Sequence, residues 1–130
     1  HVEFWEDYGE YNVDWKYDSQ TNSYLRSNGE KPHTDLNNKK QLSAKNVAVV
    51  FMRESNAFDG YENNLHLLYR TKGSGKAQIY LDGEEILGTW RKADRESRLI
   101  LLDASGEEVK FNRGLIWFEI VPIGSLVQAK

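Results

Sequence analysis

The second half of the chain alternates short stretches of β-forming residues with turns that contain glycine. Between Asn46 and Pro122 it reads NVAVVFMR, NLHLLYRTKGSGKAQIYLDGEEILGTW, RLILLDASGEEVKF and GLIWFEIVP. Apolar side chains recur at every second position in most of these stretches, which is the period of a β-strand. No window of helical length shows the 3.6-residue period of an amphipathic helix. This half of the chain therefore predicts short strands that pair mainly with their sequence neighbours.

Two features of this run predict specific structures. Residues 46–53 carry apolar side chains at odd and even positions alike, which is typical of a central strand covered on both faces. The Asp82-Gly83 pair lies between two alternating segments and predicts a tight hairpin, because both central positions of a type I′ turn need positive φ. Residues 64–70 predict another strand, and residues 99–111 predict a second hairpin.

The first 45 residues are more polar but show the same organisation. Residues 13–17 alternate as a strand, residues 18–22 form a turn cluster, and residues 23–26 fit a return strand. Residues 29–40 lack a period, and Pro32 removes a ladder donor, so this segment predicts a loop. We therefore expect a single mainly β domain over residues 1–130, with antiparallel sheets forming a sandwich or a partly open barrel and little helix.

Composition and charge restrict the class of partner. The chain has 130 residues, 17 Lys and Arg against 20 Asp and Glu, and a net charge of −3. The cations are interspersed with acids, so no clustered basic tract predicts a nucleic-acid partner or direct binding to an anionic membrane. No run approaches the roughly 20 apolar residues of a membrane-spanning helix. Cysteine is absent, which excludes disulfides and thiolate metal sites.

His33 is the first candidate for acid–base chemistry. It lies two residues before Asp35 in an extended segment, so the two side chains can share one side of the chain. An aspartate that orients an imidazole is half of an acid–base pair, and His33 with Asp35 are weak catalytic candidates on that ground. The favoured interpretation is structural, with both side chains hydrogen-bonding the loop to the sheet, because no nucleophile completes a catalytic set.

Neither a metal nor a cofactor is expected. The sequence contains no HxH, HExxH or CxxC spacing. The segment from Gly73 to Gly75 lacks the ending of a P-loop, and a hairpin turn explains it better. Acidic residues near Asp59 and Asp82 are scattered without EF-hand spacing, which favours ordinary surface carboxylates.

Aromatic residues and one arginine supply candidate binding residues. Tyr24 and Arg26 lie on one strand close to the His33 loop, and Arg26 can bind a carboxylate or form a cross-strand ion pair. Phe58 and Tyr61 lie in a second loop and can anchor a partner. Trp90 and Trp117 are expected in the core. The aromatic segment from residue 4 to residue 17 is either a partner-binding strip or an edge strand.

A set of short motifs, in order along the chain, resembles the C-terminal domain of the DUF3048 family. The motif residues are Tyr24 and Arg26; Pro32, His33 and Asp35; Lys45, Asn46 and Val47; Gly73, Gly75 and Ala77; Asp82 and Gly83; Gly88, Thr89 and Trp90; Asp103 and Gly106; Gly114 and Trp117; and Val121 and Pro122. Each motif alone is weak, but their order over residues 13–122 is specific. Arg113 stands where the family more often has proline, which affects a turn.

The resemblance implies part of an exported, lipid-anchored bacterial protein, found mainly in Gram-positive organisms, without its N-terminal domain and signal. The family brings no established enzymatic activity. We therefore expect a non-enzymatic binding or scaffold domain that contacts an envelope protein or cell-wall material through residues 32–35, residues 58–61 and nearby aromatics. One alternative is a peptidoglycan-acting enzyme with His33 as the base and Asp35 as its orienter. The other is a domain that only stabilises the N-terminal domain.

Overall fold

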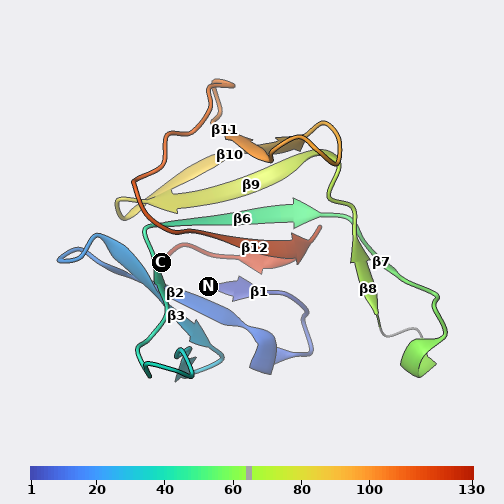
Figure 1. Cartoon of the computed structure of the whole chain (residues 1–130), viewed down its shortest axis with the longest axis horizontal. Helices are drawn as coiled ribbons and strands as arrows, with labels where there is room; N and C mark the ends of the chain where they lie inside the picture. The colour runs from blue at the N-terminus through green and yellow to red at the C-terminus, as the bar shows by residue number, and fades with distance from the viewer. Residues whose placement is uncertain (64–65) are drawn as a thin grey trace.

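The computed structural model describes residues 1–63 and 66–130, and its regular structure consists almost entirely of β-strands. Two sheets pack against each other, and a two-stranded arm projects from one side (Figure 1). The helical elements in the described residues are two short 3-10 turns, η1 (Gly9–Tyr11) and η2 (Tyr61–Asn63). No helix in these ranges is long and apolar enough to cross a membrane. The prediction of a mainly β fold with little helix is confirmed.

The N-terminal sheet contains the first five strands of the chain and the last one. Its strands are β1 (Val2–Glu3), β2 (Val13–Asp18), β3 (Ser23–Asn28), β4 (Lys31–Pro32), β5 (Ser43–Ala44) and β13 (Leu126–Val127). Their order is β13-β1-β2-β3-β4, with β5 also paired to β3. The predicted loop over residues 29–40 therefore includes a short strand. Pro32 is tolerated there because β4 is an edge strand, where a missing N–H costs no ladder bond.

The central sheet has the order β11-β10-β9-β6-β12. Its strands are β6 (Asn46–Met52), β9 (Gly73–Leu81), β10 (Glu84–Lys92), β11 (Ile100–Leu102) and β12 (Ile116–Pro122). One pair departs from the antiparallel expectation, because β12 runs parallel to β6. The chain after β11 returns along one end of the sheet, so β12 enters beside β6 in the same direction (Figure 1). The predicted second hairpin is reduced to β11 and a single bridge from Leu102 to Glu108.

A two-stranded arm extends from the end of β6. It consists of β7 (Glu54–Asn56) and β8 (Leu67–Tyr69), with η2 near its tip (Figure 1). The strand predicted over residues 64–70 is thus observed as β8, while residues 64 and 65 of that prediction lie outside the described residues.

Strand β6 forms the core of the molecule, as its two apolar faces predict. Val47 and Val49 face the N-terminal sheet, whereas Ala48 and Val50 face the other side, and each is at most 1% exposed. The second side is filled by residues of the central sheet and the segment that follows it, including the predicted core residue Trp90. The doubly covered strand is therefore confirmed.

The β9–β10 hairpin confirms the turn predicted at Asp82-Gly83. Both residues have positive φ, at 57° and 80°, and nine residue pairs follow the turn in register. Gly83 also packs closely, since a Cβ there would come within 2.6 Å of the Tyr17 ring. This hairpin provides two of the five strands of the central sheet.

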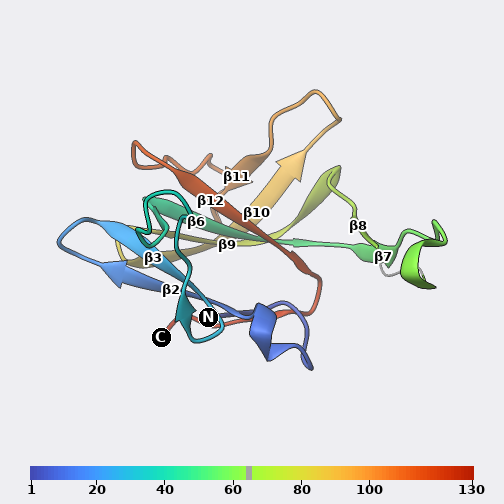
Figure 2. The ribbon, with the colours of Figure 1, turned by 60° about the horizontal axis from the view of Figure 1, so that its bottom comes forward.

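The N-terminal sheet covers only part of the central sheet. Cross-sheet packing involves Val49, Val121 and Tyr80, which belong to β6, β12 and the far end of β9. Figure 2 shows β2 and β3 beneath this part, while β10 projects away from them. We call the β6–β12 part the covered half and the β9–β10 part the open half. On the open half, Leu87 remains 60% exposed.

Candidate functional site

The covered half contains a buried ion pair between the two sheets. Arg26 of β3 and Glu119 of β12 are 7% and 5% exposed, and Arg26 Nε donates to Glu119 Oε1 at 3.0 Å. Trp15 Nε1 donates to the same carboxylate oxygen at 3.2 Å. The guanidinium carbon also lies 4.9 Å from the centroid of the Trp117 ring, within cation–π range. Arg26 is therefore an inter-sheet ion-pair partner whose charge is satisfied inside the protein.

His33 lies at the edge of this cluster and contacts Arg26. Its Nδ1 is 2.5 Å from Arg26 Nη1. Because a guanidinium has donors only, Nδ1 must accept, which places the hydrogen of a neutral ring on Nε2. The His33 backbone N–H also donates to the Arg26 carbonyl at 3.0 Å. These contacts match the structural interpretation, in which the residue fastens the loop to β3.

The Asp35 carboxylate is turned away from this arrangement. Its Oδ1 accepts hydrogen bonds from the backbone N–H groups of Asn37 at 2.7 Å and Asn38 at 3.2 Å. This is an Asx-type turn, which shapes the loop locally. No hydrogen bond joins the His33 and Asp35 side chains in the described part of the chain, so the structure does not bring the weak catalytic candidates together.

The other predicted binding residues lie in two further places. Tyr24 is 5% exposed, and its hydroxyl accepts the Gly83 N–H at 2.9 Å; burial raises its pKa. Phe58 and Tyr61 are 78% and 52% exposed on the arm, far from β3 (Figure 1). The Tyr61 ring stacks on His66 at a centroid distance of 4.3 Å. The six predicted residues therefore do not form one site.

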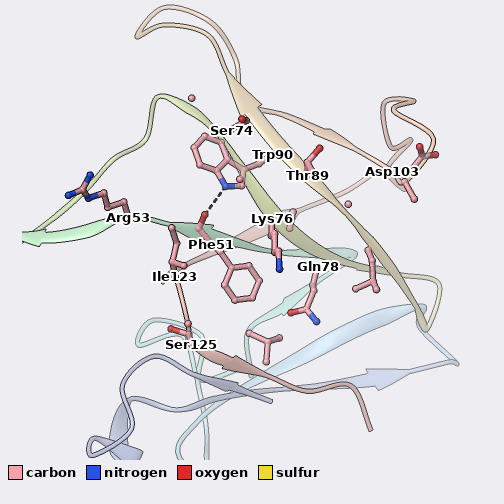
Figure 3. A pocket seen from close by; sticks show the side chains of 18 of the residues that line it. Phe51, Arg53, Ser74, Lys76, Gln78, Thr89, Trp90, Asp103, Ile123 and Ser125 are labelled. Atoms are coloured by element: carbon pink, nitrogen blue, oxygen red, sulfur yellow. Dashed lines mark hydrogen bonds between the residues drawn. The ribbon is translucent and has the colours of Figure 1, made fainter.

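An open groove on the exposed face of β9 and β10 is a different candidate. It has a volume of about 1620 Å³ and extends from the base of the arm to the 103–106 turn. Its floor carries side chains such as Lys76 and Gln78, and its opposite wall is the segment from Ile123 to Val127 (Figure 3). The groove exists because the N-terminal sheet ends before it covers this half.

The groove wall and floor are held by hydrogen bonds to backbone carbonyl groups. The Ile123 N–H donates to the Met52 carbonyl at 3.1 Å, and Ser125 Oγ donates to the Phe4 carbonyl at 3.1 Å. At the rim, Trp90 Nε1 donates to the Phe51 carbonyl at 2.8 Å (Figure 3). These contacts fix both sides of the groove to the two sheets.

Four exposed cations belong to the lining of the groove. The lining includes Arg53, Arg70, Lys72 and Lys76, and no described residue pairs with any of these four side chains. Asp103 is the one acidic residue in the lining formed by the described residues, and its carboxylate accepts hydrogen bonds in its own turn. The groove therefore carries excess positive charge in a chain whose net charge is −3.

The Asp103 carboxylate belongs to its turn rather than to the groove cations. Oδ1 accepts from Ser105 Oγ at 2.6 Å and from the backbone N–H groups of Ser105 and Glu107 at 2.9 and 3.0 Å. The Ser105 hydroxyl and then the Glu107 N–H hold the pKa of Asp103 below its ordinary value. Its negative charge at neutral pH thus stabilises the 103–106 turn.

Sequence reasoning missed this groove for a simple reason. Ser74, Lys76 and Gln78 alternate with buried residues, which is the ordinary pattern of a solvent-facing strand. The available signal was Leu87, an aliphatic residue on the same polar face. Among the described residues, no group of three or more His, Cys, Asp or Glu side chains is arranged to hold a metal ion.

Comparisons with known proteins identify the family. The model of the family described as "Protein of unknown function (DUF3048) C-terminal domain" matches residues 2–118. The chain belongs to the DUF3048 C-terminal domain family. The crystal structure of the YerB protein from Bacillus subtilis has a TM-score of 0.72 and 22% identity, over 85% of this chain and 36% of that chain. At this identity the likeness shows a shared fold. The search of curated proteins found no match.

Several of the DUF3048 motif residues line the groove. The glycine motif of β9, the Gly88-Thr89-Trp90 motif of β10 and the Asp103 turn all belong to its lining. Gly75 has a direct packing role, since a Cβ there would lie 2.5 Å from Trp90 Nε1 and 2.8 Å from the Phe51 carbonyl oxygen. Some of the motifs that carry the DUF3048 resemblance therefore build the scaffold of this groove.

Proposed function

We propose that this DUF3048 domain is a non-enzymatic binding domain of an extracytoplasmic, lipid-anchored bacterial protein, and that it holds an envelope protein in the groove of the open half. The observation that carries this proposal is the uncovered face of β9 and β10, with exposed aliphatic side chains and cations that pair with no described residue. Exposed apolar patches beside polar groups are typical of interaction sites.

Family membership supports the cellular setting. The resemblance implies an exported protein held at the membrane only through an upstream lipid anchor, so a partner in the cell envelope is the natural candidate. Phe58 and Tyr61, exposed on the arm, give a second surface for the same partner. Arg26, His33 and Tyr24 act in this proposal as internal supports of the fold, because their polar atoms are engaged by protein groups.

A site-specific cross-linking experiment in cells tests the proposal. A photoreactive benzoylphenylalanine is placed at Leu87, in the groove, or at Leu36, which is 83% exposed outside it. We expect irradiation to give a discrete cross-linked protein in the envelope fraction from position 87 and none from position 36. The same product from both positions, or none from position 87, would contradict the groove as the binding site.

Fractionation of the same cells tests the setting separately. The protein is expected in the membrane fraction, accessible to protease added outside the cytoplasmic membrane. Recovery in the cytosol would overturn the proposed localisation, whatever the cross-linking shows.

A further inference from the structure

The charge of the groove restricts what can occupy it. Arg53 and Arg70 lie together at the base of the arm, where the Arg70 N–H donates to the Arg53 carbonyl at 2.9 Å. Lys72 and Lys76 also line the groove, and Lys76 lies on its floor (Figure 3). These side chains are exposed and lack acceptors among the described residues. An occupant with carboxylates at this end would provide the missing counter-charges.

Beyond the cations the groove lining becomes aliphatic. Leu87 lies opposite Gln78 in the hairpin register and is 60% exposed. Across the groove, Ile123 and Leu126 are 72% and 44% exposed. Burying such side chains against apolar groups of a ligand is favourable, at about 25 cal/mol per Å² of apolar surface. The occupant therefore needs aliphatic groups next to its anionic part.

The aromatic side chains in the groove are unsuitable for stacking on sugars or bases. Trp90 is 3% exposed and its indole N–H is already engaged, while Phe51 is half-buried. Recognition of glycans and of single-stranded nucleic acids depends on exposed aromatic faces. The groove provides aliphatic and hydroxyl groups in their place, which suits the side chains of a peptide.

The length of the floor matches a short extended peptide. Residues 73–78 of β9 line the groove, and six strand residues span roughly 17 Å at about 3.3 Å per residue. We infer that the groove binds an extended peptide segment of the partner. Acidic residues of this peptide contact the lining cations, such as Arg53 and Lys76, and its aliphatic residues contact Leu87 and Leu126. This inference rests on the proposed function and adds to it the chemistry of the partner segment.

Fluorescence anisotropy with defined peptides tests this assignment on the whole 130-residue chain. The probe is the fluorescein-labelled octapeptide EDEGLSLG, compared with the neutral QNQGLSLG and the non-aliphatic EDEGSSSG. We expect EDEGLSLG to bind, and the neutral peptide to bind about ten-fold more weakly because the exposed charge pairs are lost. EDEGSSSG should also bind several-fold more weakly. Equal binding of EDEGLSLG and QNQGLSLG would overturn the inference.

Variants of the protein locate the binding. The double change R53Q/K76Q is expected to weaken EDEGLSLG binding about ten-fold, since each exposed pair contributes modestly. The matched control R95Q/R113Q removes two exposed arginines outside the groove and should leave binding unchanged. Leu87→Ser should weaken binding, whereas Leu36→Ser should not. An equal loss in the two double variants would contradict binding in the groove.

A competition arm separates a peptide from other anions. Polyphosphate and heparin are expected to compete weakly, and only at low salt, because they provide charge without aliphatic groups. If either binds more tightly than EDEGLSLG and is insensitive to Leu87→Ser, the ligand is an anionic polymer and the peptide assignment is wrong. If no peptide binds but position 87 still cross-links a protein in cells, the ligand chemistry fails while the proposed function stands. Failure of both overturns the function itself.

Discussion

The covered and open halves are parts of the same face of one sheet, but their charged side chains differ in burial and pairing. On the covered half, Glu119 is 5% exposed, and its carboxylate is satisfied by Arg26 and Trp15 from the other sheet. On the open half, Lys76 projects from the same face into a groove with no partner among the described residues. Burial makes pairing obligatory, whereas exposure leaves a charge available for a ligand. The covered half therefore pairs its charges inside the protein, whereas the open half carries the charges that the proposed binding would use.

The strongest test of this contrast is Glu119→Ala. The change removes the carboxylate that accepts from the buried Arg26 Nε and from the partly buried Trp15 indole N–H. Removing one partner of a buried pair costs about 3–5 kcal/mol of unfolding free energy. Urea unfolding followed by circular dichroism measures the loss.

The matched control is Glu108→Ala, which breaks the exposed Arg98–Glu108 pair. Its unfolding midpoint should stay close to that of the parent chain, because solvent screens exposed pairs. The apolar double variant R26M/E119L should recover much of the stability lost in Glu119→Ala. Similar losses in Glu119→Ala and Glu108→Ala would remove the distinction between the two halves.

A smaller effect is expected at the boundary between the halves, from Gly75→Ala. The new methyl group would lie 2.5 Å from Trp90 Nε1 and 2.8 Å from the Phe51 carbonyl oxygen, on the line of their hydrogen bond. Overpacking of this kind costs about 1–3 kcal/mol. Tryptophan fluorescence during unfolding should report both the lower stability and a changed indole environment. Ser74→Ala, one residue earlier and exposed, is the control and should be neutral.

On the open half we expect loss of binding without loss of stability. Lys76→Gln and Leu87→Ser alter exposed side chains, so the unfolding free energy should change by no more than about 0.5 kcal/mol. The same variants should weaken binding of the acidic peptide. A large loss of stability for Lys76→Gln would show that the Lys76 ammonium stabilises the fold. The two halves would then not differ in how their charges are used.

The smallest effect is expected in acid, at the Asp103 turn. Hydrogen bonds from Ser105 and Glu107 lower the pKa of Asp103 in the folded chain. Because the pKa of Asp103 is lower in the folded chain than in the unfolded chain, ionised Asp103 stabilises the fold. This stabilisation is fully present above the pKa in the unfolded chain, about 4, and is lost as the pH falls through the pKa in the folded chain. The melting temperature of Asp103→Asn should therefore depend less on pH below about 4 than that of the parent. An unchanged pH dependence would contradict this role.

Local patterns in the sequence predicted the local parts of the fold. Asp82-Gly83 specified the β9–β10 hairpin, and the two apolar faces of residues 46–52 specified a central strand. The parallel β6–β12 pair and the β1–β13 pair could not be predicted this way, because each joins distant segments without a turn signal.

The candidate site was harder to predict than the fold. The sequence shows Arg26 as a charged residue beside a loop. Its partner Glu119 lies on a distant strand, and only packing of the two sheets buries both residues. The groove depends on where the N-terminal sheet stops, which no local pattern encodes. In the sequence, Lys76 and Leu87 therefore have the pattern of ordinary surface residues.

The parallel pairing of β6 with β12 also has a consequence for the order of folding. The β9–β10 hairpin closes locally, on a timescale of about 1–10 μs for such turns. Residues 46–52 can pair with residues 116–122 only after the intervening chain has been looped back, and non-local β pairing typically takes milliseconds to seconds. We expect the floor of the groove to form early, and the strand carrying Glu119 to be added late. The floor of the groove would then be assembled before the contact that secures the two sheets.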